Sequence, residues 1–452
     1  MKKTPTPTRS PQERAFLVGI EVADTPALLS MDDSLRELAL LANTADLSVV
    51  GEASQRIRQP HPRTLLGSGK VEEIKALAED AVADIILFDD ELSPRHQREL
   101  EQIFGEDVRV VDRTALILDI FALHAHTREG ALQVELAQYE YRLPRLTRAW
   151  THLARQAGGG AGRSGSVGGV GLRGPGETQL EVDRREISRR ITHLRREIEK
   201  VRSHRRRYRA QRKRAAIPTV AIVGYTNAGK STLLNRLSGA DVYVADQLFA
   251  TLDPTTRRIK LAGGREILLS DTVGFIQKLP TTLVAAFRAT LEEIRDADLL
   301  LHVVDITHPN FRAQAQAVQQ TLDELEVSDL PVVTALNKID LLADPRAALE
   351  WVDDFERAVP VSAISGAGLP SLLAAIEGEL LEGMAPIEVL LPYEQGRMIS
   401  LFHEAGSVEL VEHLRNAVHM RGRIPRPLLA DYAPFLKRRT SRRKADAEPS
   451  GE

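Results

Sequence analysis

The chain contains no cysteine among its 452 residues. This absence excludes disulfide bonds, thiolate-ligated zinc and a cysteine nucleophile. No apolar run reaches the ~18 residues that a membrane-spanning helix needs, and residues 1–8 lack the apolar segment of a secretory signal peptide. We therefore expect a cytoplasmic protein with no membrane span. The formal net charge of −3 indicates no polyanionic partner by itself, but the charges are unevenly distributed along the chain.

One motif organises the rest of the sequence. Residues 224–231 read Gly-Tyr-Thr-Asn-Ala-Gly-Lys-Ser and match G-x-x-x-x-G-K-S/T at every position. The β-branched run 219–223 precedes the motif and predicts a buried strand, and an apolar repeat at helical spacing follows it. Backbone N–H groups of such a loop converge on a phosphate, Lys230 supplies a charge for the β- and γ-phosphates, and Ser231 can bind magnesium. A glycine-rich turn without chemistry is the alternative, and the matching flanks disfavour it.

Two switch motifs follow this loop. Thr251 lies in the loop-rich segment 249–254 and is expected to order over the γ-phosphate and magnesium. The strand expected at 267–271 ends in an Asp-Thr-Val-Gly motif. We place Asp271 in the magnesium shell and expect the Gly274 amide to sense the γ-phosphate.

Guanine recognition is predicted at the end of a later strand. The motif Asn337-Lys-Ile-Asp340 closes the buried run 332–337. The Asp340 carboxylate can accept both the ring N–H and the exocyclic amine of guanine, whereas adenine would leave a buried carboxylate unpaired. Residues 361–364 would close over the base from the other side. Each motif is weak alone, but the ordered set predicts a GTP-hydrolysing P-loop domain with a doubly wound sheet.

These motifs define the candidate site. The predicted catalytic residues are Lys230, Thr251 and Gly274, and the predicted magnesium ligands are Ser231, Thr251 and Asp271. The predicted nucleotide-binding residues are Gly224, Tyr225, Thr226, Asn227, Ala228, Gly229, Lys230, Ser231, Thr232, Phe249, Ala250, Thr251, Leu252, Asp253, Asp271, Thr272, Val273, Gly274, Asn337, Lys338, Ile339, Asp340, Ser362, Ala363 and Ile364.

Two residues depart from a generic reading of this site. Phe275 stands where Ras-like GTPases carry a glutamine that orients the attacking water. Phenylalanine has no donor or acceptor, so we expect slow hydrolysis alone and acceleration by a partner that reorders the switches. Asn227 resembles an asparagine that helps to hold potassium beside the phosphates in some GTPases; the alternative is an asparagine that only stabilises the turn.

Alternating strands and helices in residues 15–112 predict a small parallel α/β domain. The expected strands are 15–22, 47–51, 84–89 and 108–112, and the expected helices are 35–41, 71–81 and 93–104.

Three features between residues 64 and 126 are predicted to carry no chemistry. Residues 67–70 imitate part of a phosphate loop, but Thr64 and Val71 stand where a glycine and a hydroxyl residue are required, so we expect a turn before a helix. His124 and His126 lie two apart in an expected helix and point in different directions, which disfavours a metal pair. Asp89 and Asp90 are adjacent and would point to opposite faces of a continuing strand.

The segment 182–214 is strongly basic. It contains fifteen Lys and Arg against four Asp and Glu, a net charge of +11. The expected helix at 177–214 would therefore attract a phosphate backbone. A solvated helix face balanced by the partner helix is the alternative, but Glu135, Glu140 and their neighbours are too few to cancel the charge.

A glycine-rich segment, 158–176, separates this basic helix from the helical region that begins at residue 113. Its glycine content cannot hold a regular element, and Arg163 and Arg173 are its only charges. We expect a long loop at the tip of a helical hairpin, suited to entering a crevice in a large RNA. No aromatic platform accompanies it, so sequence-specific reading of single strands is not supported.

The predicted organisation has six parts. In chain order they are a disordered tail (1–14), an N-terminal α/β domain (15–112), a helical hairpin (113–214), a GTPase domain (215–384), a small C-terminal α+β domain (385–436) and a disordered basic tail (437–452). The C-terminal strands are expected at 387–391, 408–413 and 417–423, with a helix at 395–404.

A set of longer motifs resembles the HflX family of ribosome-associated GTPases. They are Arg173-Gly-Pro-Gly-Glu-Thr-Gln-Leu-Glu181, Leu132-Gln-Val-Glu-Leu-Ala-Gln-Tyr-Glu-Tyr141 followed by Leu143-Pro-Arg145, Phe249-Ala-Thr-Leu-Asp-Pro-Thr255 and Asp271-Thr-Val-Gly-Phe275. The resemblance covers about residues 15–436. It implies GTP-dependent binding to the large ribosomal subunit and its RNA, with the hairpin reaching toward the peptidyl-transferase region. It also implies splitting of stalled or idle ribosomes and release after hydrolysis.

Two other functions are compatible with the residues. One is a ribosome-assembly GTPase, which needs the same RNA affinity and nucleotide switch. The other is an RNA-remodelling or RNA-modifying enzyme with an auxiliary GTPase; the missing cysteine and the lack of a cofactor-binding glycine fingerprint after an N-terminal strand disfavour it. We expect a monomer that binds GTP and GDP with Mg2+, and we leave a role for K+ near Asn227 open.

Overall fold

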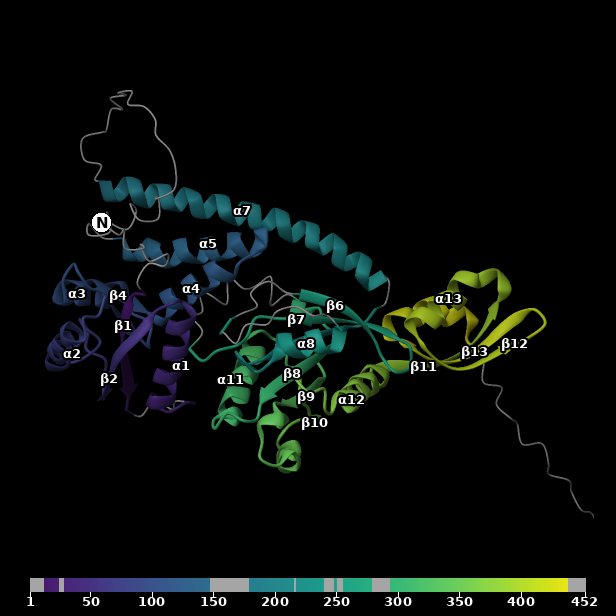
Figure 1. Ribbon diagram of the computed structural model, residues 1–452. Helices are drawn as coiled ribbons and strands as arrows, with labels where there is room; N and C mark the ends of the chain where they lie inside the picture. Colours follow the sequence, from purple (N-terminus) through teal and green to yellow (C-terminus); the bar gives the residue numbers. More distant parts are fainter. Residues whose placement is uncertain are drawn as a thin grey trace, which may run out of the picture.

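The computed structural model describes residues 12–23, 28–146, 179–214, 217–239, 248–249, 255–278 and 293–437. Three sheets follow one another along the molecule, and a long helix lies over the first two (Figure 1). Among the described residues, no helix is both long and apolar enough to cross a bilayer.

The N-terminal sheet has the strand order β2-β1-β3-β4 and is parallel throughout. Its central strands are buried on both faces, as expected for a parallel sheet covered by helices. Ser30 and Ser93 cap the helices that follow them, because each side chain accepts a backbone N–H of the first turn. The elements are β1 (Arg14–Val22), α1 (Met31–Thr44), β2 (Ser48–Ile57), α2 (Ser68–Asp80), β3 (Ile85–Phe88), α3 (Pro94–Phe104), β4 (Arg109–Asp112) and α4 (Arg113–His124).

Three local expectations for this domain are wrong. Strand β2 continues to Ile57 because it pairs with β1 along its whole length, which a run containing Gly51 and Glu52 did not suggest. Helix α2 begins at Ser68, so most of the segment expected to be a turn is helical. His126 lies beyond the end of α4, whereas His124 closes that helix.

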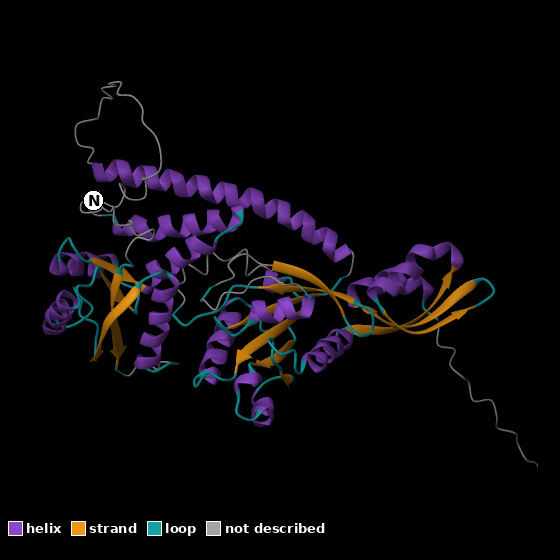
Figure 2. Ribbon diagram, in the orientation of Figure 1, coloured by secondary structure: helices purple, strands orange, loops and turns teal. Residues whose placement is uncertain are grey.

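The helical hairpin consists of α5 (Arg128–Arg142), the short η1 (Leu143–Arg145) and α7 (Gln179–Arg214), which is 36 residues long. Leu194 of α7 is fully buried, and Ile191 and Ile198 beside it are nearly so. This 3–4 residue spacing places one apolar stripe of α7 against α5 (Figure 2).

The GTPase sheet has the order β10-β9-β8-β5-β7-β6, and β6 is its antiparallel strand. Alternate residues of β5 face opposite layers: Val220 and Ile222 pack with α8 and α12, whereas Ala221 and Val223 pack with α11. The predicted doubly wound sheet is confirmed. Its elements are β5 (Thr219–Gly224), α8 (Lys230–Ser238), β6 (Thr255–Lys260), β7 (Glu266–Asp271), β8 (Leu299–Asp305), α11 (Phe311–Glu324), β9 (Val332–Asn337), η3 (Ile339–Leu341), η4 (Pro345–Asp354), β10 (Ala358–Pro360) and α12 (Leu369–Glu382).

The C-terminal sheet is antiparallel with the order β11-β13-β12. Helix α13 and the last short helices cover one face, where the rings of Phe402 and Tyr432 meet edge to face at 5.6 Å. The elements are β11 (Met384–Pro392), η5 (Tyr393–Gln395), α13 (Gly396–Ala405), β12 (Ser407–His413), β13 (Ala417–Pro425), η6 (Arg426–Leu428), α14 (Leu429–Tyr432) and η7 (Ala433–Phe435).

Candidate functional site

The phosphate loop connects β5 to α8, and two of its glycines are required by the backbone. Gly229 has φ +93°, and a Cβ there would lie 2.4 Å from Asn337 Nδ2. A Cβ on Gly224 would lie 2.3 Å from the Val303 carbonyl oxygen. The first and last glycines of the motif therefore let the loop approach neighbouring strand ends closely.

Lys230, in the first turn of α8, points back into the loop. Its Nζ donates to the carbonyl oxygens of Gly224 at 3.1 Å and Tyr225 at 2.7 Å. Burial lowers the pKa of Lys230 to about 8, with the nearby Asp271 carboxylate opposing the shift. The lysine is thus a confined charge at the centre of the loop.

Two predicted magnesium ligands converge. The Ser231 hydroxyl donates to Asp271 Oδ2 at 2.6 Å, where α8 begins and β7 ends. Thr272 Oγ1 donates to the Ile222 carbonyl at 2.7 Å and ties the end of β7 to β5. A hydroxyl and a carboxylate oxygen suit Mg2+. The third predicted ligand, Thr251, lies outside the described residues.

The switch segment after β7 lies directly on the phosphate loop. Thr226 N–H donates to the Phe275 carbonyl at 2.8 Å, and Phe275 N–H donates to the Gly224 carbonyl at 3.1 Å. A Cβ on Gly274 would lie 2.9 Å from Thr226 Cα and 3.0 Å from Lys230 Nζ. Only glycine fits between the loop and the switch in this arrangement.

The earlier switch segment is described at residues 248–249 alone. Phe249 has φ +58°, is 3% exposed, and meets Phe121 of α4 edge to face at 4.6 Å. The predicted residues 250–253 lie outside the described part of the chain. Sequence reasoning missed the contact with Phe121, since no local pattern signals an aromatic pair between two domains.

The base-recognition motif is held together by Asn337. Its Nδ2 donates to the Ala228 carbonyl at 2.8 Å, and its Oδ1 accepts Ala363 N–H at 3.0 Å. This side chain joins the phosphate loop to the 361–364 segment, in which Ser362 is fully buried and Ile364 is 70% exposed.

The two charged residues of this motif differ in their surroundings. Lys338 has φ +71°, and its ammonium lies 2.6 Å from Asp305 Oδ2 at the end of β8. Asp340 is exposed on η3, whereas the argument for guanine recognition from the sequence assumed a buried carboxylate. Asp305 is a partner that the motif search missed, although its place at a strand end could have suggested it.

Asn227 is exposed at φ +59°. Asparagine adopts this left-handed conformation more readily than most residues. This conformation is the one that the turn-stabilising alternative for Asn227 requires.

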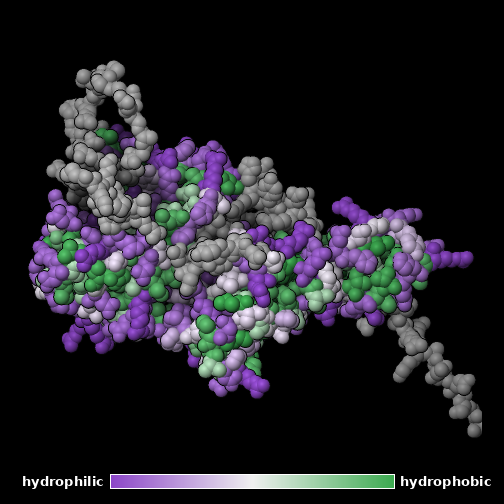
Figure 3. Space-filling model, viewed as in Figure 1, coloured by the Kyte–Doolittle hydropathy of each residue, from purple (hydrophilic) through white to green (hydrophobic). Residues whose placement is uncertain are grey.

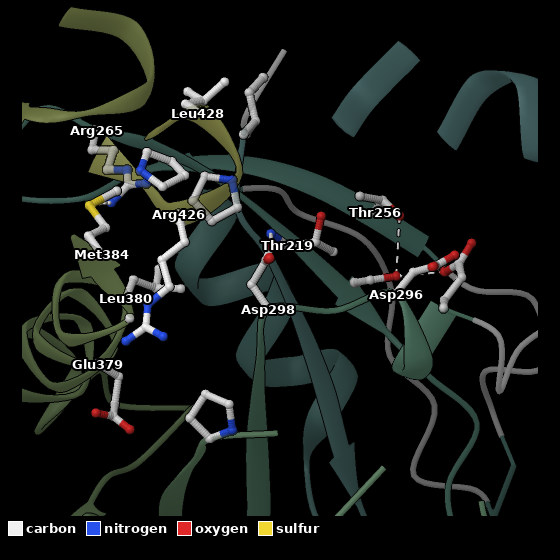
Figure 4. A pocket seen from close by; sticks show the side chains of 17 residues that line it. Thr219, Thr256, Arg265, Asp296, Asp298, Glu379, Leu380, Met384, Arg426 and Leu428 are labelled. Carbon is white, nitrogen blue, oxygen red and sulfur yellow. Dashed lines mark hydrogen bonds between the residues drawn. The ribbon is translucent and has the colours of Figure 1, made fainter. Parts of the chain in front are cut away.

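A separate cavity of about 480 Å³ lies where the GTPase and C-terminal domains meet (Figure 4). Thr219, Asp298 and Pro331, at or just before the first residues of β5, β8 and β9, line it. The cavity is thus at the amino ends of the strands, the edge of the sheet opposite the phosphate loop. Thr256, Ser270 and Glu293 form a hydrogen-bonded chain along one wall.

Three family models match the chain in succession. They are described as GTP-binding GTPase N-terminal (residues 32–122), GTP-binding GTPase Middle Region (124–212) and 50S ribosome-binding GTPase (219–338). GTPase HflX of Caldanaerobacter subterraneus subsp. tengcongensis is 46% identical over 397 residues, which cover 88% of this chain and 87% of the relative. GTPase HflX of Escherichia coli K12 is 45% identical over 88% of this chain and 90% of its own length. The chain belongs to the HflX family of GTPases.

The HflX membership settles the reaction as GTP hydrolysis. A solved structure of a GTP-binding protein from Sulfolobus solfataricus in complex with GDP is 25% identical to this HflX chain. The match covers 81% of this chain and 98% of that one, with a TM-score of 0.41.

Proposed function

We propose that this GTPase binds the large ribosomal subunit and splits stalled or idle ribosomes, and that the ribosome stimulates its hydrolysis of GTP. The observation that carries the proposal is the long basic helix α7, mounted on α5. The description of the family model over 219–338, 50S ribosome-binding GTPase, supports the same partner. We further propose that the protein is a cytoplasmic monomer that associates with ribosomes through this hairpin.

The charge of α7 is balanced unevenly along its length. In its first half, Arg190 lies 2.7 Å from Glu135 and Arg195 lies 2.8 Å from Glu140, so α5 supplies counter-charges there. Residues 205–214 contain seven Lys and Arg and no acidic residue. Hydrophilic side chains are prominent along the upper edge of the molecule, where the first half of α7 runs, with hydrophobic ones between them (Figure 3). The second half of the helix therefore has the excess charge that would neutralise RNA phosphates and release counterions.

The proposed roles at the nucleotide combine the sequence motifs with the geometry above. The loop amides and Lys230 hold the β- and γ-phosphates, Asp340 pairs with guanine, and the Gly274 amide faces the γ-phosphate. Ser231 and Asp271, with Thr251, would hold Mg2+, which when bound neutralises charge on these phosphates. Phe275 is 3% exposed and cannot orient a water, so efficient hydrolysis requires a partner that rearranges the switches.

GTP hydrolysis measured alone and with large ribosomal subunits tests this proposal. We expect slow turnover alone and strong stimulation by the subunit. Rates in K+ and in Na+ at equal ionic strength separate the two roles of Asn227, because a K+-only rate would assign the asparagine to the ion. Fast hydrolysis that subunits leave unchanged would remove the ribosome from the mechanism and favour the RNA-enzyme alternative.

A charge-removal variant tests the hairpin. Replacing Arg205, Arg206 and Arg207 by Ala should lower ribosome affinity. It should also reduce the slope of log affinity against log salt concentration by the contribution of about three phosphate contacts, while nucleotide binding by the free protein is unchanged. The matched control removes three exposed arginines of the N-terminal domain, Arg56, Arg58 and Arg63. An equal loss in the control would show that net charge alone is responsible.

Sucrose gradients distinguish splitting from subunit assembly. A splitting factor with GTP should convert intact ribosomes into subunits without other factors. An assembly factor would bind subunits and leave intact ribosomes unchanged.

A further inference from the structure

The nucleotide site does not end at the GTPase domain. Tyr225 of the phosphate loop, Phe249 and Phe275 belong to one apolar cluster that also contains Leu38 of α1 and Phe121 of α4. Both switch segments and the phosphate loop are therefore in contact with the N-terminal domain or its core.

A lysine of the second switch segment makes the most specific of these contacts. Lys278 lies four residues after Gly274 and has φ +55°. Its Nζ lies 2.6 Å from Asp89 Oδ2 and 2.7 Å from Asp90 Oδ1. The continuing strand that would point these two carboxylates to opposite faces is not present, because β3 ends at Phe88 and the chain turns. Both acids converge on one cation from another domain.

Asp89 is the buried member of this contact, whereas the Lys278 and Asp90 side chains are 31% and 32% exposed. The Asp89 side chain is fully buried, and it also accepts the Ser34 hydroxyl at 2.7 Å and Arg113 Nη1 at 2.7 Å. Burial pushes the pKa of Asp89 upward, but Arg113 and Lys278 outweigh it and the net shift is downward. Burial raises the pKa of Asp90, and Lys278 is the main group that opposes this shift. Losing the lysine would leave Asp90 without its compensating charge.

A second connection reaches the same cluster through the phosphate loop. The Tyr225 hydroxyl donates to Glu37 of α1, and it accepts Gln277 N–H at 2.9 Å. Glu37 is in turn ion-paired with Arg113. The residue before Lys278 is thus tied to the N-terminal domain through a side chain of the phosphate loop.

These contacts hold the second switch in a position that competes with a γ-phosphate. The Phe275 peptide is hydrogen-bonded to the loop through both its N–H and its carbonyl. Gly274 lies so close to Lys230 that an added Cβ would be 3.0 Å from Nζ. Lys230 must reach the β- and γ-phosphates of GTP. A phosphate that binds the Thr226 N–H, which now donates to the Phe275 carbonyl, would displace Phe275 and the residues after it.

We propose that Lys278, Asp89 and Asp90 form a latch through which the N-terminal domain holds the second switch on the phosphate loop and so favours GDP over GTP. GTP binding displaces Phe275 from the phosphate loop and withdraws Lys278 from the two carboxylates. Asp89 and Asp90 are positioning residues that set nucleotide preference from outside the GTPase domain. Coupling between two binding sites is reciprocal. If GTP raises the affinity of a partner for the freed acidic pair, that partner raises the affinity for GTP by the same factor.

The first test is the ratio of the dissociation constants for GDP and a non-hydrolysable GTP analogue. Lys278→Ala and Asp90→Asn should each shift this ratio toward the GTP analogue by about fivefold or more, the lower end of usual coupling between sites. The double variant should shift it no further than the single ones, because both remove the same contact. Lys278→Arg, which keeps the charge, should restore most of the wild-type ratio.

Arg63→Ala is the matched control, since it removes an exposed ion pair with Glu99 in the same domain and should leave the ratio unchanged. Unaltered ratios in folded Lys278→Ala and Asp90→Asn proteins would overturn the proposal.

Hydrogen exchange of the full chain is a second measurement. A contact that only stabilises the fold would give the same exchange rates with both nucleotides. In the wild type, the GTP analogue should increase exchange at residues 34–38 and 89–93 relative to GDP. In Lys278→Ala, exchange there should be high with both nucleotides. Equal protection in both wild-type complexes would show that the latch does not open. No ribosome is used, so failure here and failure of ribosome binding are independent results.

Discussion

The two parallel sheets of this protein share an architecture but differ at the carboxyl ends of their strands. In the GTPase sheet, β5 is followed by a glycine loop that turns backbone amides outward. In the N-terminal sheet, β3 and β4 are followed by charged side chains: Asp89 and Arg113 pair with each other, and Arg113 is 1% exposed. Ligands of open α/β sheets bind at this edge. Such an edge can bind a nucleotide where the backbone leaves it open, and it becomes an interface where side chains fill it.

Removing Arg113 from the filled edge of the N-terminal sheet has the largest expected effect. Arg113→Met leaves the Glu37 and Asp89 carboxylates buried without their shared cation, so we expect a loss of about 3–5 kcal/mol. The measurement is the opening free energy of β1 and β3 amides by hydrogen exchange. Adding Glu37→Gln and Asp89→Asn should recover part of the loss. A cost no larger than that of Arg63→Ala would mean that the charges at this edge are solvated.

Asp340→Asn tests the edge that is open to ligand. Asparagine can no longer accept both N–H groups of guanine, so GTP affinity should fall by roughly 10- to 100-fold and the preference over ATP should narrow. Xanthine carries an oxygen where guanine carries its amine, so XTP should bind the variant better than it binds the wild type. Competition binding with the three nucleotides checks this. Unchanged guanine selectivity would contradict the base-recognition role.

The pH dependence of nucleotide binding is the smallest expected effect. Burial lowers the pKa of Lys230 to about 8 in the free protein, and a bound phosphate favours the charged lysine. Above pH 8 binding must therefore take up a proton, and affinity should fall as pH rises, by at most about tenfold per unit. Below pH 8 this group contributes no slope. GDP titrations from pH 6.5 to 9.5 measure the profile; a flat profile would mean that Lys230 stays charged without nucleotide.

How much of the structure the sequence predicts depends on how far apart along the chain the interacting residues lie. Strand β9 begins and ends at the predicted residues, because a run buried on both faces is a continuous apolar segment. The phosphate loop is likewise local, since eight consecutive residues specify it. The end of β2 was missed because pairing with β1, not its own composition, extends it. Lys278 was missed because its partners lie 188 and 189 positions away in the chain.

The continuity of α7 has a mechanical consequence. At 1.5 Å per residue, its 36 residues span about 54 Å. The helix ends at Arg214, and β5, whose far end is the phosphate loop, begins at Thr219. Only the four residues 215–218 connect the end of this long helix to the strand that leads into the phosphate loop, so the hairpin has a short covalent route to the nucleotide site.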